Sequence, residues 1–94
     1  MNFINKPNKI ILMDEHGHMV AAVTFPDITD KTVNIQHTFV DSSLRGQGIA
    51  GQLMLEVVKQ LRQTGKKANL VCDYAAYWFK KHPEHQDVLI KRSE

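Results

Sequence analysis

The chain has 94 residues, of which 43% are apolar and 23% are charged, a balance typical of one folded domain with no room for a second core. No apolar run approaches the roughly 20 residues of a membrane-spanning helix, the first residues show no secretory signal, and the single cysteine excludes an internal disulfide. The formal net charge of +2 does not demand nucleic acid, so we expect a single cytoplasmic domain over residues 1–94 that is a small enzyme, a ligand-binding module or an interaction domain.

The first 40 residues predict β-structure. Apolar or alternating runs indicate three strands, at residues 9–13, 19–25 and 32–40. A polar segment with glycine separates the first two runs, and turn residues beginning at Pro26 separate the second from the third. Strict alternation in the third run places one set of side chains on a common face: Val33, Ile35, His37 and Phe39. The pattern predicts an antiparallel meander.

After residue 40 the apolar spacing becomes helical. An amphipathic helix is expected over 46–64, with an apolar stripe formed by Ile49, Leu53, Met54, Val57, Val58 and Leu61. A short strand follows at 68–72, and then a helix at 74–81 that Asp73 caps. The order is β-β-β-α-β-α, an α/β (α+β) class. A right-handed crossover makes strands 32–40 and 68–72 parallel within a mixed sheet.

A glycine-rich segment, Arg45-Gly46-Gln47-Gly48-Ile49-Ala50-Gly51, joins the third strand to the first helix. A helix start has unpartnered N–H groups and partial positive charge, and glycines let an anion approach the backbone. Arg45 adds donors suited to phosphate oxygens. The segment therefore predicts a phosphate or pyrophosphate site, and a tight turn without a ligand is the simpler alternative.

Two common nucleotide motifs fit this segment poorly. Its Gly-x-Gly-x-x-Gly spacing matches the dinucleotide fingerprint, but residues 41–45 separate it from its strand and antiparallel strands precede it. A Walker A loop needs Gly-Lys-Ser/Thr, whereas the chain has Gly51-Gln52-Leu53.

The run from Val40 to Met54 resembles the acetyl-CoA-binding motif of the GNAT superfamily of acyl-CoA N-acyltransferases. The core of that motif, Gln/Arg-x-x-Gly-x-Gly/Ala, occurs here as Arg45-x-x-Gly48-x-Ala50. The resemblance covers roughly residues 10–90 and implies a minimal GNAT-like fold of the short, single-domain branch. Longer members carry additional helices and strands near the acceptor pocket, so the acceptor and the oligomeric state stay open.

The resemblance implies acetyl-CoA as co-substrate, with its pyrophosphate on the backbone of 46–50 and its pantetheine arm in a gap between strands 32–40 and 68–72. The cofactor-binding residues implied are Phe39, Val40, Arg45, Gly46, Gln47, Gly48, Ile49, Ala50, Tyr74 and Tyr77. Tyr77 is the first candidate for contact near the leaving thiolate, and Tyr74 is the second.

Acetyl transfer needs a base that removes a proton from the ammonium form of the acceptor, or a nucleophile that takes the acetyl group first. The short GNAT branch is similar in its histidine-threonine pair and its Cys-x-Tyr sequence, here His37-Thr38 and Cys72-x-Tyr74. The resemblance thus implies His37 and Cys72 as the catalytic pair. If their strands are neighbours, the histidine favours the thiolate. Both side chains also have a plain structural alternative as core residues.

The sequence therefore predicts an acetyl-CoA-dependent N-acetyltransferase that acts on an unidentified amine, with no nucleic-acid or membrane partner. One alternative is a CoA-binding module without efficient catalysis, acting as a sensor or partner protein. A second alternative is a small nucleic-acid-binding domain, based on the basic residues Lys59, Arg62, Lys66, Lys67, Lys80 and Lys81. No metal is expected, because the histidine pairs His16/His18 and His82/His85 each supply only two ligands.

Overall fold

The computed structural model describes residues 2–91 as six short strands, a long helix, a seventh strand and a second helix, with two 3-10 turns. The strands are β1 (Asn2–Lys6), β2 (Lys9–Met13), β3 (Met19–Thr24), β4 (Asp27–Thr29), β5 (Thr32–Ile35), β6 (His37–Val40) and β7 (Lys67–Leu70). The helical elements are η1 (Ser42–Leu44), α1 (Ile49–Thr64), α2 (Asp73–Lys81) and η2 (Pro83–Val88). None of these helices is long and apolar enough to cross a membrane.

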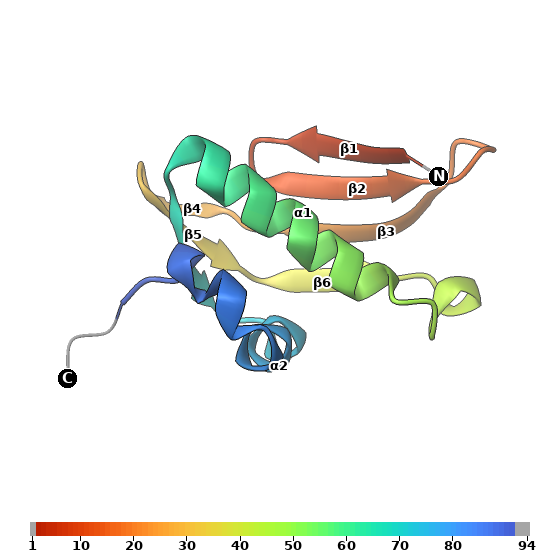
Figure 1. Cartoon of the computed structure of the whole chain (residues 1–94). Coiled ribbons are helices and arrows are strands. Elements are labelled where there is room, and N and C mark those ends of the chain that lie inside the picture. The colour runs from red at the N-terminus through yellow and green to blue at the C-terminus, as the bar shows by residue number, and fades with distance from the viewer. Residues whose placement is uncertain (1, 92–94) are drawn as a thin grey trace.

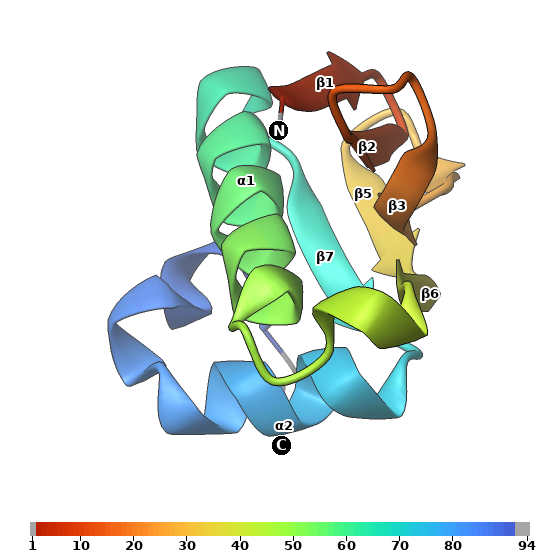
Figure 2. The same cartoon turned by 90° about the vertical axis from the view of Figure 1, so that its right-hand side faces the viewer.

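The strands form two ladders. One is antiparallel in the order β1-β2-β3-β6, and the other has the order β4-β5-β7 with β5 and β7 parallel. Helix α1 connects β6 to β7 and lies across one face of the strands, as Figures 1 and 2 show. The mixed sheet and the parallel crossover are confirmed. Strands β1 and β4 were not predicted, and β4 occupies part of the segment expected to be a turn.

The expected strand 32–40 is interrupted at Gln36, which belongs to neither β5 nor β6. Its N–H donates to the carbonyl oxygen of Thr24 at 3.0 Å. One residue outside the ladders reverses the alternation of side chains, as in a β-bulge. Val33 and Ile35 are therefore buried, whereas His37 and Phe39 are exposed on the opposite face. The prediction that these four side chains share a face is wrong.

The core lies between α1 and the strands. All six residues of the predicted apolar stripe are buried, and Leu55, outside the stripe, is 46% exposed. The helix begins at Ile49 rather than at residue 46, because Gly46 and Gly48 have φ angles of +84° and +74° that are not helical. It ends at Gly65, which adopts the left-handed conformation (φ 72°) common at helix ends.

Helix α2 packs against the first turn of α1. A Cβ on Gly51 would lie 3.4 Å from Nε1 of the buried Trp78, so this glycine permits close approach of the two helices. The strand before α2 ends at Leu70 rather than residue 72. The expected cap by Asp73 is also wrong: Cys72 occupies the N-cap position and Asp73 is the first helical residue, where its charge suits the helix dipole.

Leu53 is fully buried under the strands, and Leu55 projects outward from the same helix. We expect Leu53→Ala to lower the free energy of unfolding by about 3 kcal/mol, and Leu55→Ala to change it by less than about 0.5 kcal/mol. Urea unfolding followed by circular dichroism measures both. Equal losses for the two variants would contradict the assignment of the buried face of α1.

Candidate functional site

The two ladders separate at Ile35. The parallel pairing of β5 with β7 runs from Thr32 opposite Lys67 to Ile35 opposite Leu70. The N–H groups of Val71 and Cys72 then both donate to the carbonyl oxygen of Ile35, at 3.0 and 2.9 Å. Beyond this point β6 continues along β3, while the chain after β7 turns into α2. The expected divergence is present, and β6 forms an edge of its ladder.

The start of α1 faces this opening. Gly48 is its N-cap residue, with no side-chain cap, and the first helical bond runs from the N–H of Gln52 to the Gly48 carbonyl at 3.2 Å. The amides of residues 49–51 therefore have no acceptor within the helix. No atom lies within 4 Å of the position of a Cβ on Gly46 or Gly48. The glycine backbone that precedes the helix is therefore open to an approaching anion.

A cavity of about 240 Å³ lies at this helix start, between the end of β6 and α2. It is lined by Val40, Leu44, Arg45, Gly46, Gly48, Ile49, Ala50, Gly51 and Tyr74. Seven of the ten predicted cofactor-binding residues are in this set. The other three, Phe39, Gln47 and Tyr77, lie outside the lining, and Leu44 and Gly51 were not predicted to belong to it.

The loop that presents Arg45 is ordered by Asp41. This carboxylate accepts a hydrogen bond from the N–H of Ser43 at 3.1 Å and a second, short one from the Ser43 hydroxyl. The Ser43 hydroxyl is the main cause that holds the pKa of Asp41 below its ordinary value, and the Ser43 amide and the charge of Arg45 act in the same direction. Asp41 is therefore ionised at neutral pH, and it fixes the turn that carries Arg45 to the rim of the cavity.

Tyr74, rather than Tyr77, contacts the cavity. Tyr74 is half-buried, and its Oη lies 3.8 Å from the position of a Cβ on Gly51. Burial raises the pKa of its phenol, and Tyr77 and Cys72 add to the effect, so the hydroxyl remains a proton donor at neutral pH. Tyr77 is 56% exposed, and the Nζ of Lys81 lies 5.1 Å from its ring centroid.

Cys72 is half-buried at the point where the strands separate, and its Sγ lies 3.6 Å from the Oγ1 of Thr38. His37 is exposed and pairs with Thr24, and alternation along β6 directs its ring away from the face that carries Thr38. The structure thus brings Thr38, not His37, to Cys72. The sequence analysis named Thr38 only as the partner of His37 in a motif, and it expected His37 beside Cys72 because it carried the alternation of β5 unbroken through Gln36.

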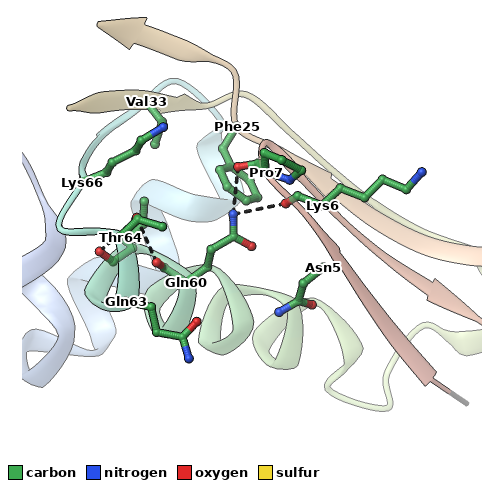
Figure 3. Close-up of a pocket in the computed structure, with 10 residues that line it drawn as sticks. Asn5, Lys6, Pro7, Phe25, Val33, Gln60, Gln63, Thr64 and Lys66 are labelled. Atoms are coloured by element: carbon green, nitrogen blue, oxygen red, sulfur yellow. Dashed lines mark hydrogen bonds between the residues drawn. The ribbon is translucent and has the colours of Figure 1, made fainter. Parts of the chain in front are cut away.

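A second cavity, of about 390 Å³, lies between the β1–β2 turn and the last turns of α1 (Figure 3). The side-chain amide of Gln60 crosses it and donates to the carbonyl oxygens of Lys6 and Pro7 at 3.1 and 2.8 Å. None of the predicted site residues lines this cavity. Gln60 therefore ties α1 to the first hairpin, at the opposite end of the helix from the glycine loop.

The remaining histidines and several basic residues have local partners. Trp78 stacks on His82 and His85, with ring centroids 4.3 and 5.5 Å apart. Arg62 pairs with Asp87 at 2.7 Å, and Lys66 pairs with Asp27 at 3.0 Å. Among residues 2–91, no three or more His, Cys, Asp or Glu side chains gather in the manner of a metal site.

Comparisons with known proteins show the family to which the chain belongs. A family model described as GCN5-related N-acetyl-transferase matches residues 10–88. Protein NATD1 from Xenopus tropicalis is 33% identical over 66 residues, which are 70% of this chain and 61% of that protein, and its zebrafish (Danio rerio) counterpart is 32% identical over 70 residues, 74% of this chain and 64% of that protein. The match thus spans less than two thirds of each of these relatives.

Two solved structures share the fold and more than a quarter of the aligned sequence. A GCN5-like protein from Staphylococcus aureus has a TM-score of 0.78 and 27% identity, and the match covers 99% of this chain and 91% of that one. The GNAT family N-acetyltransferase YhbS from Escherichia coli, in complex with CoA, has a TM-score of 0.64 and 28% identity, with 73% of this chain and 42% of that one covered.

The lowered pKa of Asp41 depends first on Ser43, so Ser43→Ala should move it up toward its ordinary value of 3.8. In the wild type the ionised carboxylate supports the loop above pH 3.8, and this support is lost as the pH falls through the lowered pKa. The carboxyl carbon shift of Asp41, followed against pH by NMR, measures the change. Ser42→Ala is the matched control, and an unchanged Asp41 titration in Ser43→Ala would contradict the assigned cause.

Proposed function

Because the chain belongs to the family of GCN5-related N-acetyl-transferases, we propose that it binds acetyl-CoA at the start of α1 and transfers the acetyl group to an amine. The observation that carries this proposal is the uncapped helix start, which faces an open cavity at the end of β6, the strand whose outer edge is left free once the ladders have separated at Ile35. The CoA complex of the related E. coli protein supports the same donor for this chain.

The cavity suits a diphosphate. The amides of residues 49–51 supply donors that no side-chain cap occupies, and the helix dipole favours negative charge there. Arg45 adds a permanent positive charge at the rim, held in place through Asp41 and Ser43. Gly46 and Gly48 keep the approach open because neither presents a side chain.

From this anchor, the acyl arm has a path along β6. The free edge of that strand offers backbone donors and acceptors near Phe39 and Val40, in the opening beside Cys72. In this arrangement Tyr74 lines the cavity that holds the diphosphate end of the arm, and its neutral hydroxyl is suited to donate a hydrogen bond to the bound donor. Gln47 and Tyr77 would then contact outer parts of the donor.

Two routes lead from this complex to product. In the direct route, the amine attacks the thioester carbonyl, the bond from that carbon to the CoA sulfur breaks, and the amine proton leaves to a base. In the covalent route, the Cys72 sulfur attacks the thioester carbonyl, the bond from that carbon to the CoA sulfur breaks, and the Cys72 proton passes to the CoA thiolate. The amine then attacks the acetyl-cysteine, the bond from the carbonyl carbon to the Cys72 sulfur breaks, and the thiol is regenerated with a proton from the amine. We favour the covalent route, because Cys72 is half-buried at the opening. His37, whose ring lies on the opposite face of β6, does not stand beside Cys72, so in this route the proton that the ammonium form of the acceptor loses before it attacks passes to solvent.

Binding is tested by titrating ¹⁵N-labelled protein with acetyl-CoA. We expect the amide signals of residues 46–50 to shift, and Arg45→Ala to weaken binding about tenfold through the loss of a charge-assisted contact. Lys59→Ala, an exposed change elsewhere on α1, is the matched control. Signals of 46–50 that stay in place at saturating ligand would refute the donor site.

Catalysis is tested by mass spectrometry and by steady-state rates with a panel of small amines. We expect one acetyl group on Cys72 after incubation with acetyl-CoA, and a loss of rate on the order of 100-fold or more in Cys72→Ala. Val71→Ala is the control for a neighbouring change. Full activity in Cys72→Ala would exclude the covalent route, so that only the direct route remained. Binding of acetyl-CoA without transfer to any amine would instead indicate a CoA-binding module.

A further inference from the structure

The face of the β1-β2-β3-β6 ladder opposite α1 has no helix over it within residues 2–91 (Figure 2). The pairing register aligns the side chains on this face into two rows that cross all four strands. The apolar row consists of Ile4, Ile11, Ala22 and Phe39. The basic row beside it consists of Lys6, Lys9, Thr24 and His37.

The apolar row is open and uneven. Ile4 and Phe39 are 41% and 46% exposed, whereas the small Ala22 between Ile11 and Phe39 is 7% exposed. The row crosses three strand spacings, roughly 14 Å. Its side chains repeat about every 5 Å, close to the spacing of i and i+4 side chains on a helix. An amphipathic helix of about ten residues therefore matches the row in length and period.

The positive charges of the basic row determine which charges a docked helix should carry. Lys6, Lys9 and His37 carry the only ionisable groups of the two rows, and neither row contains an acidic side chain. A second copy of this chain would bring a similar basic row toward the first, which like-charge repulsion opposes. A segment with an apolar stripe and carboxylates along one flank complements both rows at once.

We propose that this face docks an acidic, amphipathic helix of the protein that carries the acceptor amine. The inference rests on the proposed function and gives it a class of acceptor. Both rows end on β6, where His37 and Phe39 stand at the edge beside the opening that contains Cys72. A helix seated across the rows would thus deliver a neighbouring lysine or N-terminal amine to the point where the thioester is expected.

The probe is a synthetic peptide of about 14 residues with blocked ends, leucines four residues apart, glutamates along one flank and a single lysine. Added to ¹⁵N-labelled protein, it should shift the amide signals of residues 4, 11, 22 and 39. The double variant Lys6→Glu/Lys9→Glu should bind it about fivefold more weakly, and a peptide with arginines in place of the glutamates should reverse that preference. The control Lys59→Glu/Lys80→Glu carries the same change in net charge on other elements and should bind like the wild type.

The outcomes of this experiment distinguish failure of the docking surface from failure of the acetyl-CoA site. Peptide shifts that are absent or scattered over the protein, while acetyl-CoA still shifts 46–50, would overturn the docking surface alone. Loss of peptide binding in the Lys59→Glu/Lys80→Glu control would also overturn it, because the effect would then follow net charge. Binding of phosphatidylserine vesicles without binding of the peptide would assign the face to a membrane and overturn the proposal.

Discussion

The carbonyl oxygen of Ile35 is the point on which the architecture depends. It accepts the amides of both Val71 and Cys72, and with these two bonds the parallel ladder of β5 and β7 ends. At the next residue, the N–H of Gln36 donates to the carbonyl oxygen of Thr24, and from His37 onward the chain pairs with β3 in the antiparallel ladder. Because β6 then has a neighbouring strand on one side only, the N–H and C=O groups on its other edge are not paired by a strand, as they would be in a continuous sheet. The opening is thus built from the hydrogen-bond pattern of the backbone.

The second half of the site comes from an unsatisfied helix end. Leaving the first amides of α1 without acceptors reduces the stability of the helix, and most helices relieve this with a side-chain cap. Here a glycine stands at the cap position, while six buried apolar residues further along hold the helix on the sheet. Packing therefore stabilises a helix whose first turn stays available to a ligand.

The sequence predicted correctly those features that depend on residues close together in the chain. The apolar stripe of α1 follows from the 3.6-residue period of its apolar residues. The end of the helix at Gly65 follows from the freedom of glycine to adopt a left-handed conformation. Seven of the ten residues predicted to bind the cofactor also line one cavity at the glycine loop. The failures concern pairing between distant segments. The exposed strand β1 has no alternating apolar pattern that would predict it, and it forms because it pairs with β2. The face on which His37 lies depends on the hydrogen bond from the N–H of Gln36 to the carbonyl oxygen of Thr24.

The packing of Gly51 against Trp78 has an optical consequence. Trp78 is the single tryptophan of the chain, and its indole nitrogen touches the helix turn that borders the glycine loop. Its ring is stacked on two imidazoles from the end of α2 and from η2. The protein therefore contains a single tryptophan fluorophore directly behind the cavity at the start of α1, and its emission spectrum reports on the environment of that cavity without any added dye.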